Sequence, residues 1–199
     1  MLFSARAGAI QIKNDRALAS MRAAGRLASE CLAWILAQVQ PGMTTLDIDD
    51  LQNQFAEKHG VIPAPRGYKG FPKSICTSPN EVICHGIPSR QVVLREGDIV
   101  GIDVTLILEG YHGDNAATVP VGRVDGEASR LLRTTLEAQR QGIAAVRPGA
   151  RLGDIGAAIQ AVVEPEGFSV VRDFVGHGIG RVFHEEPQVP HFGEAGRGV

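Results

Sequence analysis

Asp103 and Asp114 are the two residues whose type and spacing most clearly suggest chemistry. β-Branched and aliphatic residues fill the stretch 100–108, Glu109-Gly110 can form a tight turn, and residues 111–119 can return as a partner strand. The sequence therefore predicts a β-hairpin that carries one aspartate on each strand.

The length of the turn decides whether the two carboxylates meet. With two residues in the turn, Thr105 lies opposite Asp114 and Asp103 lies opposite Ala116. Both aspartates then share one face of the hairpin as diagonal neighbours, roughly 7–8 Å apart at Cα. A turn longer by one residue would reverse this parity, and one aspartate would then cap a turn or face solvent.

Two carboxylates that converge on a mostly apolar sheet repel each other and lose hydration. This costs several kcal/mol unless a cation or a shared proton relieves it. A divalent metal ion is the simplest relief, so a metal site at Asp103 and Asp114 is one hypothesis for the hairpin, beside an aspartate that caps a turn or faces solvent.

The histidines are further candidates, and they are His59, His85, His112, His177, His184 and His191. His177 lies among glycines that let backbone and ligand approach closely, which favours a functional role. His112 lies two residues before the second aspartate and either supports the site or belongs to the surface. His59 ends a predicted helix, where it suits a solvated position. Taken singly, His85 and His184 are typical of ordinary hydrogen-bonded histidines.

The composition indicates a globular protein. Its 199 residues are 44% hydrophobic, which is enough for one domain, or one and a half, with a substantial core. A net charge of -2 without a basic block gives no electrostatic argument for nucleic acid. The opening residues 1–12 are too weakly apolar for a signal peptide or a membrane span. We expect a soluble, cytoplasmic protein.

Cys31, Cys76 and Cys84 make an odd count without metal-knuckle spacing, which is typical of reduced thiols. Cys31 is expected in the core. Cys76 and Cys84 flank Pro79-Asn80, and a second hairpin over Ser74–His85 would place them opposite each other as two buried thiols beside a site.

Four helices are predicted from apolar periodicity and capping residues. The first begins after Asn14 and is stopped by Pro41-Gly42, and the second runs from Thr45 to Gly60. The pattern then restarts, with a helix over about 126–146 and another that begins near residue 152.

This restart is an internal repeat. Segments 39–48 and 146–155 align without gaps, with five identities in ten positions at a constant offset of 107 residues. A duplicated helix-helix-strand unit, over about 14–121 and 126–199, implies an α/β (α+β) fold of two halves about a pseudo-two-fold axis. The strands would form one shared, mainly antiparallel sheet with helices on one face, and the site would lie on the uncovered face.

Five motifs follow one another along the chain. They are Tyr-Lys-Gly-Phe-Pro-Lys-Ser at 68–74, Asn-Glu-Val-Ile-Cys-His-Gly-Ile-Pro at 80–88, Gly-Ile-Asp-Val-Thr at 101–105, Gly-Asp at 113–114 and Gly-His-Gly-Ile-Gly-Arg-Val-Phe-His-Glu-Glu-Pro at 176–187. Through these motifs nearly the whole chain resembles the type I methionine aminopeptidases. The resemblance implies the duplicated pita-bread fold, in agreement with the repeat.

The resemblance also implies a set of site residues. By motif position, the metal ligands are matched by Asp103, Asp114 and His177, with Asp114 bridging two cations. The catalytic histidines, which also contact substrate, are matched by His85 and His184. The pocket for the methionine side chain is matched by Tyr68, Phe71, Cys76 and Phe183.

In that family a metalloprotease removes the initiator methionine from nascent proteins and peptides, a step of N-terminal protein processing. The metal activates a water and polarises the first peptide carbonyl. The resemblance implies that His184 donates to the carbonyl oxygen and that His85 interacts with the scissile nitrogen. The ligand set suits two divalent ions per complete site, which can be Co, Mn, Fe, Ni or Zn.

One departure concerns the end of the chain. The family supplies two further glutamate ligands after the Phe-His-Glu-Glu-Pro motif, and the residues up to Val199 contain neither, since Glu185 and Glu186 belong to the motif itself. We therefore expect a single peptidase domain over 1–199, truncated at its C terminus. Such a chain should have little or no activity and should bind a single metal ion weakly.

The alternative is a catalytically inactive peptide-binding module on the same fold. Proline-specific peptidases and creatine hydrolases share the fold but are disfavoured, because they generally carry an extra N-terminal domain. The expected partners are nascent polypeptide N termini or short peptides, without nucleic acid or membrane. Ribosome association is left open, and a complete chain is expected to be a monomer.

Overall fold

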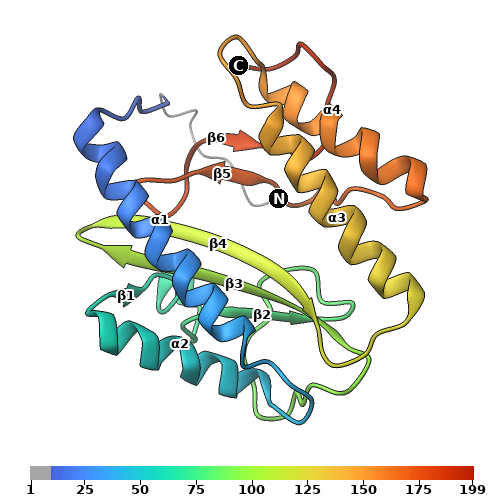
Figure 1. Ribbon diagram of the computed structural model, residues 1–199. Coiled ribbons are helices and arrows are strands. Elements are labelled where there is room, and N and C mark those ends of the chain that lie inside the picture. Colours follow the sequence, from blue (N-terminus) through green and yellow to red (C-terminus); the bar gives the residue numbers. More distant parts are fainter. Residues whose placement is uncertain (1–9) are drawn as a thin grey trace. The chain divides into compact units, whose positions relative to one another are not determined.

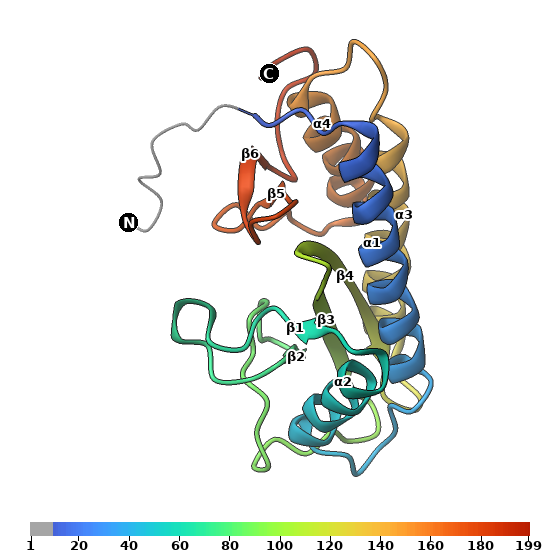
Figure 2. The same ribbon diagram turned by 90° about the vertical axis from the view of Figure 1, so that its left-hand side faces the viewer.

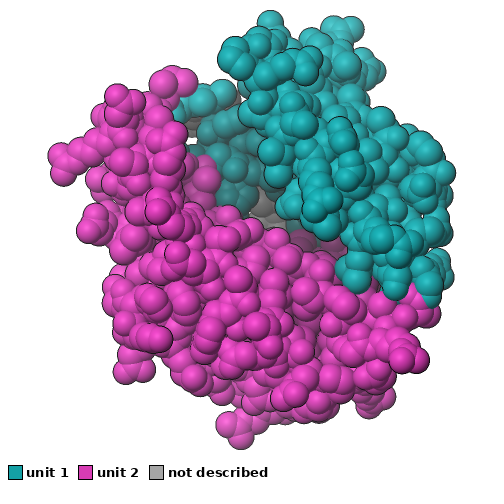
Figure 3. Space-filling model, in the orientation of Figure 1, with its two compact units in different colours: residues 1–11, 126–178, 184–199 teal, residues 12–125, 179–183 magenta. Residues whose placement is uncertain are grey.

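A computed structural model gives the structure of residues 10–199. These residues divide into two compact units (Figure 3). Unit 2 comprises Ile12–Asp125 together with Ile179–Phe183, and unit 1 comprises Gly126–Gly178, His184–Val199 and the described residues up to Gln11. The boundary after Asp125 coincides with the predicted start of the second half of the repeat.

The first helix of unit 2, α1 (Asp15–Leu36), begins as predicted. The side chain of Asn14 caps it by accepting a backbone hydrogen bond of 2.9 Å from the first turn. Its end is earlier than the predicted stop at Pro41-Gly42. The N–H of Gln38 bonds the carbonyl of Ile35 at 2.9 Å, and this three-residue turn breaks the helical pattern.

The second helix, α2 (Thr45–His59), has both of its predicted ends. Thr44 and Asp47 form a capping box in which the N–H of Thr44 donates to the Asp47 carboxylate at 2.7 Å. Gly60 closes the helix in the left-handed conformation, with φ 64°, which favours glycine.

A four-stranded antiparallel sheet completes unit 2 (Figure 1). Its strands are β1 (Ile62–Pro63), β2 (Cys76–Pro79), β3 (Ile99–Leu108) and β4 (Tyr111–Pro120), and the one-turn 3-10 helix η1 (Tyr68–Gly70) lies between β1 and β2 in sequence. The strand β3 is central, because β4 pairs along one edge of it while β1 and β2 pair with the other.

The β3–β4 hairpin has the predicted register. Glu109 and Gly110 have φ values of 50° and 79°, as a two-residue turn with the right-handed twist of the strands requires. Thr105 therefore lies opposite Asp114, and Asp103 lies opposite Ala116, as the sequence predicts.

The two faces of this hairpin differ in character. The helix α1 packs on one face (Figure 2). Ile102, Val104 and Leu106 are fully buried in the core on that side. Because side chains alternate along a strand, Asp103 and Thr105 occupy the opposite face.

Gly113 marks a close approach between α1 and β4. A Cβ atom at this position would lie 2.2 Å from the carbonyl oxygen of Ala24 and 2.6 Å from the nitrogen of Gly25. No side chain fits between the two backbones here. The helix thus fixes the position of the strand immediately before Asp114.

The second predicted hairpin, Ser74–His85, is wrong. The strand β2 pairs with β3 instead, which places Cys76 opposite Asp103. After β2 the chain turns at Asn80, which has φ 50°, into a loop without a return strand. The backbone of β2 makes its hydrogen bonds with the long central strand β3, so it does not need a return strand from the following loop. Cys84 is consequently exposed, although we expected it to be buried.

Unit 1 contains a helix pair and a short strand pair. Its elements are α3 (Gly126–Ala144), α4 (Leu152–Val163), the 3-10 helix η2 (Glu164–Glu166), β5 (Gly176–Gly178) and β6 (Glu185–Val189). The helices pack closely at Gly142, where a Cβ atom would lie 3.0 Å from the side chain of Ile159. Among the described strands, β5 and β6 form their own antiparallel ladder, whereas one shared sheet was expected.

The aligned segments of the predicted repeat have the same local structure. Gly42 and Gly149, each after a proline, have φ values of 93° and 86°. The carboxylates of Asp47 and Asp154 each accept the N–H of the residue three positions earlier, both at 2.7 Å. This likeness supports the offset of 107 residues, and the duplication itself remains a prediction.

In the described part of the chain, no helix has both the length and the apolar character that crossing a bilayer requires.

Candidate functional site

The two aspartates of the β3–β4 hairpin meet on the face away from α1. Asp103 lies opposite Ala116, and Asp114 lies opposite Thr105, so the two acidic residues are diagonal neighbours. A hydrogen bond joins their side chains. One of the two carboxyl groups must carry a proton for that bond to exist.

The surroundings of Asp103 favour its protonated form. Its Oδ1 atom is enclosed and has no hydrogen-bond partner. Burial first, then the negative charge of Asp114 and the bond to it, raise the pKa of Asp103 to about 7. A divalent cation could replace the proton and bond the enclosed oxygen, because carboxylate oxygens are ligands for such ions. The donor set therefore fits a metal, although residues 10–199 show no group of three or more His, Cys, Asp or Glu arranged to hold one.

Two thiols lie beside the carboxylate pair, and neither is poised to react. Burial and then the charge of Asp103 raise the pKa of Cys76, which faces Asp103 across the β2–β3 ladder, to about 12. Cys84 is exposed, but partial desolvation of its thiol and the charge of the same carboxylate raise its pKa as well. Both groups are therefore neutral thiols at neutral pH, which argues against a thiolate nucleophile.

The loop after β2 holds His85 in an unusual backbone conformation. Cys84 and His85 are consecutive non-glycine residues with φ values of 49° and 53°. The loop returns to β2 at Gly86, whose carbonyl accepts the N–H of Thr77 at 3.0 Å. A Cβ atom at Gly86 would lie 2.0 Å from the carbonyl oxygen of Thr77. The close packing of Gly86 thus supports the left-handed backbone at His85.

Two of the predicted pocket residues lie together. The rings of Tyr68 and Phe183 have centroids 4.9 Å apart at an interplanar angle of 49°. Phe71 ends the 3-10 turn that begins at Tyr68, through an N–H bond of 2.9 Å to its carbonyl, and is half-buried. Cys76, the remaining pocket candidate, is buried.

The other predicted site residues belong to unit 1. The imidazole rings of His177 and His184 stack with centroids 4.1 Å apart. Nδ1 of His177 donates to the carbonyl oxygen of Gly178 at 2.9 Å, since a carbonyl can only accept, and Nε2 is then the basic nitrogen. Gly178 has no room for a side chain, because a Cβ atom would lie 2.4 Å from the carbonyl oxygen of Glu186.

The sequence interpretation missed a buried network that anchors β2. The carboxylate of Asp49 accepts the N–H of Ser74 at 2.7 Å, and Asn53 accepts its hydroxyl at 2.7 Å. Gln52 donates to the carbonyl of Ser74. The signal was present, because these three residues of α2 put polar groups on the face that carries its apolar residues. For His112 the sequence left two positions open, in support of the site or at the surface; the residue is buried, and its ring nitrogen Nδ1 bonds the carbonyl of Gly180 at 3.0 Å.

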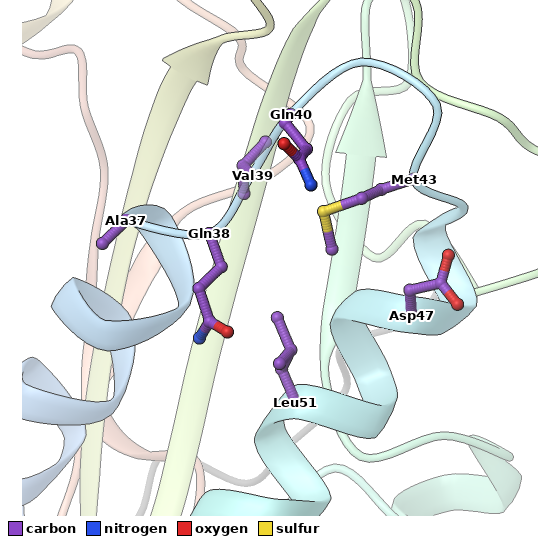
Figure 4. A pocket seen from close by; sticks show the side chains of 7 residues that line it. All are labelled: Ala37, Gln38, Val39, Gln40, Met43, Asp47 and Leu51. Carbon is purple, nitrogen blue, oxygen red and sulfur yellow. The ribbon is translucent and has the colours of Figure 1, made fainter.

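A cavity of about 510 Å³ lies elsewhere in unit 2, between the end of α1 and the first turns of α2 (Figure 4). It is lined by Ala37, Gln38, Val39, Gln40, Met43, Asp47 and Leu51. None of these residues is a predicted site residue, and the only charged one, Asp47, is occupied in the cap of α2. The cavity therefore has no part in the candidate site.

Comparison with known proteins identifies the family to which the chain belongs. The family model described as metallopeptidase family M24 matches residues 19–198. The chain thus belongs to the M24 metallopeptidases, a family that uses divalent metal ions.

Similar proteins identify the group within the M24 family to which the chain belongs. Methionine aminopeptidase A of Synechocystis sp. is 54% identical over 189 residues, which cover 95% of this chain and 75% of that protein. The crystal structure of methionine aminopeptidase from Rickettsia prowazekii matches with a TM-score of 0.93 at 51% identity, over 96% of this chain and 76% of that one. Within M24, the chain belongs to the methionine aminopeptidases, and the expected pita-bread fold is confirmed.

A more distant match concerns the fold alone. Xaa-Pro dipeptidase from Bacillus anthracis aligns with a TM-score of 0.75 at 22% identity, over 90% of this chain and 49% of that one.

Proposed function

We propose that the protein is a metal-dependent aminopeptidase that removes N-terminal methionine from nascent proteins and peptides. The observation that carries this proposal is the enclosed, unpartnered oxygen of Asp103 beside Asp114. A carboxylate pair of this kind needs a proton or a cation. Because the chain is 54% identical to a methionine aminopeptidase, a catalytic cation is the better interpretation.

In this proposal Asp103, Asp114 and His177 are the residues that would hold divalent metal. When bound, such ions lower the pKa of a water molecule and polarise a peptide carbonyl. The contribution of the chain is orientation. The hairpin keeps both carboxylates on one face. The hydrogen bond from Nδ1 of His177 to the carbonyl of Gly178 keeps the ring proton on Nδ1, so Nε2 is the nitrogen with a lone pair for a metal ion.

His184 and His85 are the groups proposed to act on the peptide. His184 donates a hydrogen bond to the carbonyl oxygen as that oxygen gains charge, and His85 interacts with the nitrogen of the scissile bond. The left-handed backbone of His85 supports a functional role, because such a conformation is unfavourable for a non-glycine residue and persists where the surroundings enforce it.

The methionine side chain is proposed to bind among Tyr68, Phe71, Cys76 and Phe183. The ring contact between Tyr68 and Phe183 supports this assignment. So does the neutral, buried thiol of Cys76. Aromatic rings and a soft thiol make an apolar, polarisable lining, which suits a thioether.

Binding and cleavage test the proposal separately. Protein loaded with Co or Mn is titrated calorimetrically with L-methionine and assayed for methionine release from Met-Ala-Ser. We expect metal-dependent methionine binding that Asp103→Asn abolishes. His184→Ala should lower turnover more than binding, because its bond strengthens in the transition state.

Controls with Lys-Ala-Ser and Glu-Ala-Ser test the pocket. Cleavage of these peptides at the rate of Met-Ala-Ser would contradict the methionine assignment. Methionine binding without any release would contradict cleavage by residues 1–199 and would agree both with the low activity expected of this chain and with the inactive peptide-binding module.

A further inference from the structure

His112 holds the segment Ile179–Phe183 against the start of β4. The backbone N–H of His112 donates to the carbonyl of Gly180 at 2.9 Å, and its ring Nδ1 bonds the same oxygen at 3.0 Å. His112 is only 9% exposed. Since a carbonyl oxygen only accepts, both nitrogen atoms of His112 are donors, and His112 donates two hydrogen bonds to the same carbonyl oxygen.

The ring of His112 also begins a row of three aromatic side chains. Its centroid lies 5.4 Å from that of Phe183 at an interplanar angle of 23°. Phe183 in turn lies 4.9 Å from Tyr68. The ring of Phe183 therefore contacts two other rings, that of His112 and that of Tyr68 in the 3-10 turn.

A second contact holds the same segment. The guanidinium of Arg181 lies 4.5 Å from the centroid of the Tyr111 ring. Tyr111 directly precedes His112, so consecutive residues of β4 engage consecutive residues of the segment. The N–H of Gly180 also bonds the carbonyl of Val182 at 3.3 Å, which tightens the turn that delivers Phe183.

We propose that His112 is a positioning residue for methionine specificity, which acts by fixing Phe183 against Tyr68. The donor at Nδ1 fixes the backbone at Gly180, and the ring fixes the side chain of Phe183. The proposal rests on the proposed function, because it assumes that Phe183 and Tyr68 line the methionine pocket. His112 itself touches neither substrate nor metal in this role.

Two substitutions separate the two parts of His112. His112→Asn keeps an N–H donor near the position of Nδ1 and removes the ring. His112→Phe keeps a ring and removes the donor. His112→Ala removes both. The matched control is His59→Ala, because His59 is an exposed histidine that stacks on Phe55 at the end of α2.

Amide hydrogen exchange measures how strongly His112 stabilises the backbone of residues 179–183, and it does not require enzymatic activity. We expect His112→Ala and His112→Phe to speed exchange in residues 179–183 about tenfold, the effect of one lost hydrogen bond, whereas His112→Asn and His59→Ala leave it near the wild-type rate. Unchanged exchange in His112→Ala would overturn the proposal. Far-UV circular dichroism verifies that each variant is folded.

The ratio of affinities for L-methionine and L-leucine measures the selectivity of the proposed methionine pocket. Loss of the ring in His112→Asn and His112→Ala should lower this ratio about tenfold, which is typical of a change in the fit of one small apolar group. His112→Phe should keep more of it, and His59→Ala all of it. A ratio that is unchanged in both ring-deleted variants would overturn the proposal. If the wild-type protein itself does not prefer methionine, the proposed function fails, while hydrogen exchange still decides whether His112 holds the segment.

Discussion

Thr105 and Asp114 face each other across the β3–β4 ladder, and this single pairing places the second aspartate on the face that already carries Asp103. The pairing depends on the two-residue turn at Glu109 and Gly110, since one extra residue would turn Asp114 toward α1. The turn thus decides whether the carboxylates meet.

Gly113 should be intolerant of a side chain. Gly113→Ala places a Cβ atom 2.2 Å from the carbonyl oxygen of Ala24 and should destabilise the fold by about 1–3 kcal/mol, because two backbones must separate. Gly25→Ala is the matched control on the facing helix. Its Cβ would meet nothing within 4 Å, and alanine in a helix interior should stabilise by about 0.5–1 kcal/mol. Urea unfolding distinguishes the two, and equal effects of both changes would refute the close contact.

Asp103 should make the stability of the metal-free protein depend on pH. Its folded-state pKa of about 7 lies above the value of about 3.9 for an exposed aspartate, so the folded chain keeps a proton that the unfolded chain has lost. This contribution to the free energy of unfolding is present below about pH 4 and is lost as pH rises to about 7. Asp103→Asn should flatten that dependence, measured by thermal unfolding in EDTA.

Addition of a divalent ion should reverse the loss at high pH. Mn or Co should raise the melting temperature of the wild-type protein more at pH 8 than at pH 5, because the ion binds the deprotonated pair. Asp103→Asn should remove this gain. An equal gain in the variant would show that the ion binds elsewhere.

The register of the hairpin and the ends of α2 follow from local sequence, which explains why they are predictable. A turn at Glu109-Gly110 and caps at Thr44 and Gly60 act within a few residues of themselves. The partner of β2 is not local. Cys76 pairs with Asp103, and the preference for that ladder over a nearby return strand depends on packing that the sequence pattern does not display.

The same distinction applies to the candidate site. Asp103 and Asp114 could be paired from alternation alone, whereas the left-handed backbone at His85 depends on Gly86 packing against Thr77. The hydrogen bond from His112 to Gly180 joins residues far apart in the chain, and no periodic pattern in the sequence predicts it.

Asp49 should be needed for the position of β2. Asp49→Ala leaves the N–H of Ser74 buried without its acceptor and should cost about 1–3 kcal/mol. Asp49→Asn keeps an acceptor oxygen and should cost less. Asp50→Ala, on the exposed side of the same helix turn, should change stability by no more than about 0.5 kcal/mol. Chemical denaturation of the three variants checks this order, and an Asp50→Ala effect as large as that of Asp49→Ala would contradict it.

The position of Ile179–Phe183 within unit 2 bears on how the chain can be divided. A cut between Asp125 and Gly126 follows the order of the elements, yet the C-terminal fragment would carry these five residues away from the unit to which they belong. The remaining fragment would lose the carbonyl that His112 bonds and the ring that faces Tyr68. The first fragment on its own therefore needs a short peptide from between β5 and β6 to complete it, because the two compact units interleave along the sequence.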